Sequence, residues 1–71
     1  MKLEKAIPYL RKEKSIKRTK KTSSMIVKFR LGKYLCCKYI YDSGKEFTEI
    51  NYKFTNEDLF AENWEITDEI L

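Results

Sequence analysis

The chain has 71 residues, of which 37% are charged and 14% are aromatic, and its formal net charge is +4. A chain this short buries only about 60% of the surface that it exposes when unfolded, so we expect one domain over residues 1–71 that gains stability from a partner chain. Its apolar runs are a few residues long. We therefore expect neither a membrane-spanning helix nor a secretory signal, and we place the protein in the cytoplasm.

Several residue types that carry chemistry are missing or poorly spaced. The chain has no histidine, the commonest general base and zinc ligand. Cys36 and Cys37 are adjacent, so in a strand they point to opposite faces and cannot jointly bind a metal ion. We expect one buried and one half-exposed thiol in a reducing compartment. Gly32 and Gly44 stand alone, which excludes a glycine-rich phosphate loop. The sequence thus predicts no enzyme, no metal and no cofactor.

Basic and acidic residues occupy different halves of the chain. Residues 1–38 hold thirteen Lys or Arg and two acids, a net +11, whereas residues 39–71 hold two lysines and nine acids, a net −7. The basic residues are densest over residues 12–21. This asymmetry has three interpretations: a site for phosphate groups, contacts between the basic face of one chain and the acidic face of another, or a solvated lysine-rich loop.

An amphipathic helix is predicted first, because Leu3, Ala6, Ile7 and Leu10 fall on one helical face. Pro8 lies within this stripe and removes a backbone hydrogen bond, so we expect a helix of about ten residues that is kinked or starts late. A short strand over residues 15–18 follows, with its isoleucine facing inward.

Three longer strands are predicted from alternating apolar and polar residues, over residues 25–31, 34–41 and 47–54. Both faces of the middle strand are largely apolar, which places it in the centre of the sheet or at a contact between chains. Gly32 and Lys33 suit a two-residue type II′ turn, and residues 42–45 form a second turn.

The end of the chain predicts a capped helix and a closing strand. Thr55 and Asp58 have the spacing of a capping box, and the helix continues through residue 61. A strand covers residues 64–67 with Trp64 in the core, and residues 68–71 are expected to fray. Together these elements predict an α+β fold, in which a small antiparallel sheet is packed by an N-terminal helix and a short C-terminal helix.

Two stretches carry a family resemblance. Residues 3–12 (LEKAIPYLRK) lead to Lys17 and Arg18, and residues 52–66 read YKFTNEDLFAENWEI. They resemble the second Thoeris anti-defence family of phage proteins, which opens with EAL-x-x-LK-x-GK-x-V-x-R and closes with an aromatic residue, Ser or Thr, and DLLA-x-DW-x-I. The resemblance covers nearly the whole chain. Glu13 replaces the opening Gly, Asn63 replaces the Asp of DW, and residues 19–24 lack the Trp that the family has there.

The resemblance implies a non-enzymatic sponge. Such phage proteins bind a cyclic nucleotide immune signal inside the host bacterial cell, either a cyclic ADP-ribose isomer or a cyclic dinucleotide. They assemble as homo-oligomers, dimers or tetramers, with pockets between the chains, and some have been labelled anti-CRISPR proteins.

A nucleotide ligand requires cations for its phosphates, and aromatic, amide and carboxylate groups for base and ribose. The candidate ligand residues are Arg18, Lys20 and Lys21 for the phosphates, and Tyr39, Tyr41, Asn56 and Asp58 for the remainder. Because the family's Trp is absent, we expect the base of the ligand to stack on Tyr34, Tyr39, Tyr41 or Tyr52.

Each candidate also has a structural interpretation, as a solvated cation, a helix cap or an interface tyrosine. Two other functions fit the sequence. One is direct inhibition of a host defence nuclease through the basic or the acidic half, and the other is nucleic-acid binding, which the acidic half disfavours.

Overall fold

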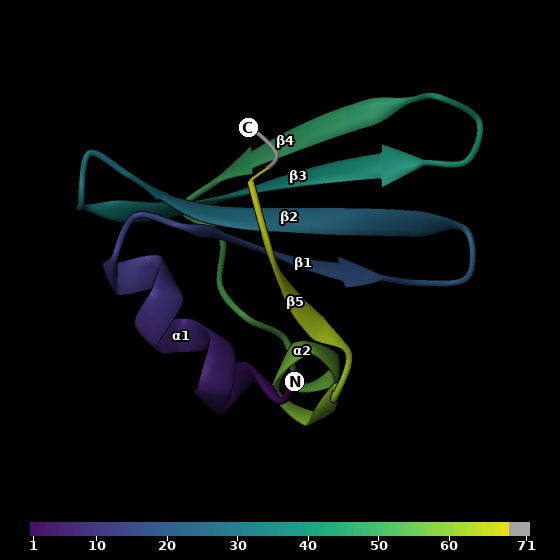
Figure 1. Cartoon of the computed structure of the whole chain (residues 1–71). Helices are drawn as coiled ribbons and strands as arrows, with labels where there is room; N and C mark the ends of the chain where they lie inside the picture. The colour runs from purple at the N-terminus through teal and green to yellow at the C-terminus, as the bar shows by residue number, and fades with distance from the viewer. Residues whose placement is uncertain (69–71) are drawn as a thin grey trace.

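The computed structural model describes residues 1–68, which form a five-stranded antiparallel sheet with both helices on one side (Figure 1). In chain order the elements are α1 (Leu3–Arg11), β1 (Ser15–Thr19), β2 (Ser23–Arg30), β3 (Tyr34–Tyr41), β4 (Glu46–Ile50), α2 (Asn56–Phe60) and β5 (Trp64–Thr67). The strand order is β4-β3-β2-β1-β5. The predicted α+β fold is confirmed. Of the end predicted to fray, residues 69–71 lie outside the described part of the chain.

The closing strand β5 returns to the opposite edge of the sheet from β4 and pairs with β1. The chain therefore crosses beneath the sheet after β4, and α2 lies on this crossing (Figure 1). The N-terminus is held at the same place, because the Met1 carbonyl accepts from the Trp64 N–H at 2.9 Å and the Met1 amine donates to the Trp64 carbonyl at 2.7 Å. Within residues 1–68, neither helix combines the length and the apolar character needed to cross a membrane.

Helix α1 covers the inner face of the sheet with the predicted stripe. Leu3, Ala6 and Leu10 are buried in one cluster with Ile16 and Trp64. The helix begins well before the proline and continues past it, so a late start is excluded. Burying each leucine stabilises the fold by about 1.5–3 kcal/mol, which offsets the one hydrogen bond that a proline removes.

The C-terminus of α1 is closed by a residue in the left-handed region. Glu13 has φ of 61°, and its N–H donates to the Leu10 carbonyl at 3.1 Å. The Lys14 N–H donates to the Tyr9 carbonyl at 3.0 Å, which completes a Schellman motif. Glycine is the residue that this motif favours, because a Cβ is disfavoured at positive φ.

Replacing Glu13 with glycine should therefore stabilise the domain. We expect a gain of about 1 kcal/mol, because the strain at positive φ exceeds the extra entropy that glycine gives the unfolded chain. A denaturant titration measures the change, and Glu13→Ala serves as the control because alanine keeps the Cβ. Equal stability of both variants would contradict the strain argument.

The β2–β3 hairpin differs from the predicted turn. Positive φ values fall on Leu31 and Gly32, at 55° and 63°, and the Lys33 N–H donates to the Arg30 carbonyl at 3.0 Å. The central pair is therefore Leu31–Gly32, with the signs of a type I′ turn, and the predicted type II′ turn over Gly32 and Lys33 is wrong. The turn lies here because the pairing of β2 with β3 continues as far as Arg30 and Tyr34, which leaves only residues 31–33 to connect the strands.

The strand predicted over residues 47–54 is also too long. Strand β4 ends at Ile50, because Asn51 adopts φ of 59° and turns the chain away from the sheet. Tyr52 and Phe54 then pack beneath the sheet, where the Phe54 ring meets the Trp64 ring edge-on at 6.0 Å. Their apolar alternation therefore reflects packing into the core and not a continued strand.

Both cysteines are buried, so the predicted half-exposed thiol is wrong. Cys36 is 2% exposed and Cys37 is 0% exposed. They lie on opposite faces of β3: Cys37 belongs to the core cluster, whereas Cys36 lies outside that cluster, with Lys28 and Ile50 beside it in register on β2 and β4. Burial raises the pKa of Cys37 to about 12, so this thiol stays protonated at neutral pH.

Candidate functional site

Two of the predicted ligand residues form a buried ion pair. Arg18 on β1 donates from Nη2 to Asp58 Oδ1 on α2 at 2.8 Å, and the two side chains are 9% and 1% exposed. The Arg18 guanidinium also lies 5.7 Å from the centre of the Trp64 ring. Its Nε is buried and finds no acceptor within residues 1–68. Most of the charge on Arg18 is therefore neutralised inside the protein.

Asp58 holds four parts of the chain together through its carboxylate and its main-chain N–H and carbonyl groups. Its Oδ2 accepts from the Tyr52 hydroxyl and from the Thr55 N–H, the latter at 2.9 Å. The Asp58 N–H donates to Thr55 Oγ1, which confirms the predicted capping box. The Asp58 carbonyl accepts from the Trp64 indole N–H at 3.0 Å. This network joins β1, the crossing segment, α2 and β5.

The electrostatics of the network favour a charged carboxylate. Burial by itself raises the pKa of Asp58, but hydrogen bonds from Tyr52, Thr55 and Arg18, together with the Arg18 charge, outweigh it and hold the pKa below its ordinary value of 3.8. Burial and the hydrogen bond to Asp58 raise the pKa of Tyr52, which keeps the hydroxyl protonated as a donor.

Acid should weaken the fold through Asp58. Because its folded-state pKa lies below 3.8, its contribution to stability is fully present above that value and is lost as the pH falls through the lower folded-state pKa. Tyr52→Phe removes one donor, so its acid unfolding should begin at a higher pH than in the wild type. Circular dichroism across an acid titration measures both midpoints, and coincident curves would contradict this assignment.

The other predicted ligand residues lie nearer the surface. Lys20 Nζ is 3.8 Å from Glu57 Oε2, which also approaches Arg18, so Lys20 joins the edge of the buried network. Tyr39 is half-buried, and its hydroxyl donates to Glu49 Oε2 at 3.0 Å. The other three, exposed to solvent, are Lys21, Tyr41 and Asn56.

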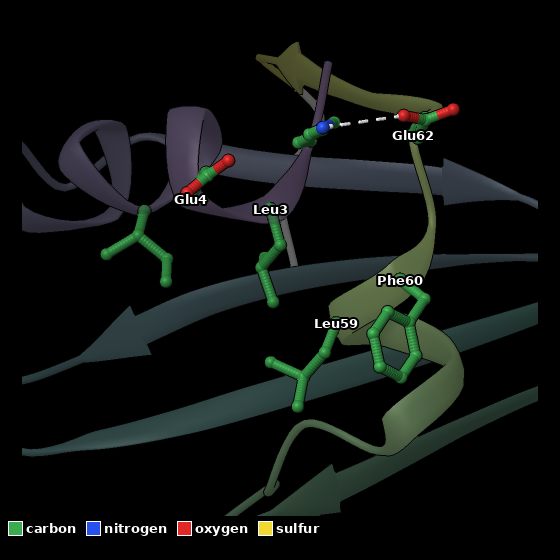
Figure 2. A pocket seen from close by; sticks show the side chains of 7 residues that line it. Leu3, Glu4, Leu59, Phe60 and Glu62 are labelled. Carbon is green, nitrogen blue, oxygen red and sulfur yellow. Dashed lines mark ion pairs between the residues drawn. The ribbon is translucent and has the colours of Figure 1, made fainter.

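Two larger hollows open on the surface at opposite ends of α1. The first, the helix groove, has a volume of about 450 Å³. It is lined by Lys2, Leu3, Glu4, Ile7, Leu59, Phe60 and Glu62. Figure 2 shows Leu3 and Glu4 on one wall, with Leu59 and Phe60 on the other. An ion pair of 3.7 Å joins Lys2 to Glu62. Two carboxylates against one lysine make this groove unfavourable for a phosphate.

The second, the hairpin hollow, has a volume of about 520 Å³. It is lined by Glu13, Lys28, Phe29, Arg30, Leu31 and Tyr34. Strand β2 pairs with β3 as far as Arg30, but its register with β1 ends at Val27. The hairpin therefore extends beyond β1, and the hollow lies at the edge that β1 leaves uncovered. A smaller depression of about 290 Å³ shares Glu13 and Phe29 with it.

The lining of the hairpin hollow suits an anionic ligand. Lys28 and Arg30 supply two cations against the single carboxylate of Glu13, and the Tyr34 and Phe29 rings supply aromatic surface. Its volume lies within the range of about 300–1,000 Å³ that is typical of small-molecule sites. Sequence reasoning named Tyr34 as a stacking candidate but missed both cations. Among residues 1–68, no three His, Cys, Asp or Glu side chains gather to hold a metal ion.

Comparison with known protein families shows to which family the chain belongs. The model of the Thoeris anti-defense 2-like domain matches residues 1–67. The chain belongs to this family. Searches of curated proteins and of solved structures each found no match to the chain. The resemblance stated from the sequence is thus confirmed over nearly the whole length.

As a Thoeris anti-defense 2-like domain, the chain is an anti-defence protein, and its family sequesters cyclic nucleotide signals. The structure shows where two residues that differ from the family motif lie. Glu13, where the motif has Gly, closes α1 at positive φ and lines the hairpin hollow. Asn63, where the motif has Asp, donates from Nδ2 to the Thr19 carbonyl at 2.9 Å and so ties the start of β5 to the end of β1.

Proposed function

We propose that this domain sequesters a cyclic nucleotide immune signal without cleaving it, and that the signal binds in the hairpin hollow. The ligand class is a cyclic ADP-ribose isomer or a cyclic dinucleotide, met inside an infected bacterial cell. Membership of the Thoeris anti-defense 2-like family supports the class. The observation that carries the location is the meeting of Lys28, Arg30 and Tyr34 in one hollow.

Each of these side chains matches one part of such a ligand. Arg30 offers a planar fork that can bind two phosphate oxygens, and Lys28 offers a point charge. The half-buried Tyr34 presents a ring on which a base can stack, and such stacking contributes about 1–3 kcal/mol per base. Arg18, the first cation predicted from the sequence, is only 9% exposed and is held by Asp58, so little of its side chain is accessible to a ligand.

Binding without turnover fits the chemistry of the chain. A sponge succeeds by holding the signal, so it needs affinity and no catalytic group. The chain has no histidine. The Cys37 thiol is buried, and burial raises its pKa to about 12, far from that of a nucleophilic thiolate. Glu13 is the one carboxylate in the lining of the hairpin hollow.

A matched pair of double variants tests the location. Lys28→Ala/Arg30→Ala removes both cations of the hairpin hollow, and Lys20→Ala/Lys21→Ala removes two cations predicted from the sequence. We expect the first to weaken binding by at least about 100-fold, because a hydrogen bond to a charged group contributes about 1.5–3 kcal/mol and each 1.4 kcal/mol is tenfold. The second changes net charge equally and should alter affinity by less than about tenfold.

Isothermal titration calorimetry against cyclic ADP-ribose isomers and cyclic dinucleotides measures these affinities, and mass spectrometry of the recovered ligand shows whether it stays intact. The reverse order of effects would move the site to Lys20 and Lys21. A wild-type chain that binds none of these nucleotides, or that returns them cleaved, would overturn the proposed function.

A further inference from the structure

Glu13 occupies a position that does not favour its own side chain. Its φ of 61° lies in the left-handed region, where a Cβ is strained and glycine is preferred. The side chain is exposed, and within residues 1–68 its carboxylate has no hydrogen-bond or ion-pair partner. Main-chain groups alone close the end of α1. The fold therefore does not need a carboxylate here, and strain of this kind is typical of functional sites.

The Glu13 carboxylate opposes phosphate binding in the hollow that it lines. Lys28 and Arg30 supply two positive charges to the hairpin hollow, and Glu13 offsets one of them. A cyclic nucleotide carries its negative charge on its phosphates, so this carboxylate weakens the attraction. In a site for an anionic ligand, such a group is useful when it accepts hydrogen bonds from another part of that ligand.

The bases of the ligand are the part that a carboxylate can distinguish. An ionised carboxylate only accepts hydrogen bonds, and it has two oxygens side by side. Guanine presents an N1–H and a 2-amino group next to each other on its Watson–Crick edge, so each oxygen finds a donor. Adenine presents the N1 lone pair beside its single amino group, which leaves one carboxylate oxygen facing an acceptor. Ribose hydroxyls also donate, but all these ligands contain ribose, so the hydroxyls do not distinguish them.

The lining of the hairpin hollow suits this division of roles. Lys28, Arg30 and the half-buried Tyr34 come from the β2–β3 hairpin, whereas Glu13 comes from the loop just past the end of α1. A base that stacks on the Tyr34 ring can therefore turn its edge toward a different element from the one that holds its phosphates. The carboxylate is the only acidic group in this lining.

We propose that Glu13 makes the hairpin hollow selective for guanine, so that this domain captures guanine-containing cyclic dinucleotides in preference to signals whose only base is adenine. The inference rests on the function and the location proposed above. It decides between the two ligand classes named there, because a cyclic ADP-ribose isomer carries adenine alone. Glu13 then acts as a specificity residue, which weakens the binding of every phosphate ligand and disfavours adenine most.

Three cyclic dinucleotides that differ only in their bases test the selectivity. Cyclic di-GMP has both donors, cyclic di-IMP keeps the N1–H and lacks the amino group, and cyclic di-AMP has the N1 acceptor instead. Isothermal titration calorimetry of the wild type should give affinities in that order. We expect cyclic di-GMP to bind at least about tenfold more tightly than cyclic di-AMP, since one hydrogen bond to a charged group changes affinity by about ten- to 100-fold.

Glu13→Gln is the variant that isolates the carboxylate. The glutamine amide has one donor and one acceptor, which match the N1 and amino group of adenine. Cyclic di-AMP should therefore bind more tightly to this variant and cyclic di-GMP more weakly, so that the ratio of the two affinities falls at least about tenfold. Glu4→Gln is the matched control, because it removes the same charge at the opposite end of α1, in the helix groove, and should leave the ratio unchanged.

Glu13→Gly separates selectivity from stability. Glycine relieves the strain at positive φ, so the melting temperature should rise while the preference for cyclic di-GMP is lost. A merely structural role for Glu13 would not produce this combination. A Glu13→Gly or Glu13→Gln chain that keeps the wild-type ratio would overturn the inference.

The results for the wild type distinguish this inference from the proposed function. Tight binding of cyclic di-GMP and cyclic di-AMP with equal affinity would overturn the selectivity and leave the proposed function standing. Binding of a cyclic ADP-ribose isomer in preference to cyclic di-GMP would do the same. A wild type that binds no cyclic nucleotide would overturn the proposed function and this inference together.

Discussion

Replacing Asp58 with alanine is expected to unfold the domain at room temperature. The substitution removes the carboxylate that pairs with Arg18 at 2.8 Å and leaves a guanidinium buried without its counter-charge. Breaking a buried ion pair on one side costs about 3–5 kcal/mol, and loss of a helix cap adds about 1 kcal/mol. A core of this size rarely supplies more than about 3–5 kcal/mol in total, so the loss should exceed the available stability.

Glu57→Ala is the matched control for this experiment. Glu57 also approaches Arg18, at 3.9 Å, but its side chain is 78% exposed, and such surface pairs contribute no more than about 1 kcal/mol. The chain has one tryptophan, and its indole N–H bonds to the Asp58 carbonyl, so its emission reports unfolding of this network directly. An Asp58→Ala chain as stable as Glu57→Ala would show that the buried pair does not hold the fold together.

The two roles of Asp58 show what the sequence could and could not predict. Its bond with Thr55 spans three residues, so spacing alone predicted the capping box correctly. Its bond with Arg18 joins residues forty positions apart and depends on where β1 lies relative to α2. The sequence does not show that Arg18 and Asp58 pair, so both were predicted to bind a ligand. The structure pairs them with each other.

The hairpin hollow could not be predicted from the sequence for a similar reason. Alternation along β2 predicted a strand, but not that its pairing with β3 would continue to Arg30 while its pairing with β1 ends at Val27. That difference in strand length leaves an edge uncovered, and it follows from the register of three strands together. From the sequence alone, Lys28 and Arg30 are therefore interpreted as solvent-facing charges on a strand, because the register of β2 with β1 and β3 is not known. The type I′ turn at Leu31 escaped prediction because leucine is a poor residue for positive φ.

Trp64→Ala is the second substitution expected to unfold the chain. Trp64 is 0% exposed, and the Phe54 ring meets it edge-on at 6.0 Å while the Arg18 guanidinium lies 5.7 Å from its centre. Truncating a buried aromatic side chain to alanine costs about 3–5 kcal/mol, and the lost indole donor leaves the Asp58 carbonyl without its partner. The far-ultraviolet circular dichroism of the variant should show an unfolded chain.

Trp64→Phe separates the two contributions, because phenylalanine keeps much of the ring packing and removes the indole donor. It should fold with a lower denaturant midpoint than the wild type, and it should bind a cyclic nucleotide with unchanged affinity, since Trp64 lies outside the lining of the hairpin hollow. A Trp64→Ala chain that folds normally and loses only nucleotide binding would place Trp64 in the ligand site. The main role of Trp64 would then be ligand binding, and its packing against the network around Asp58 would matter less for stability.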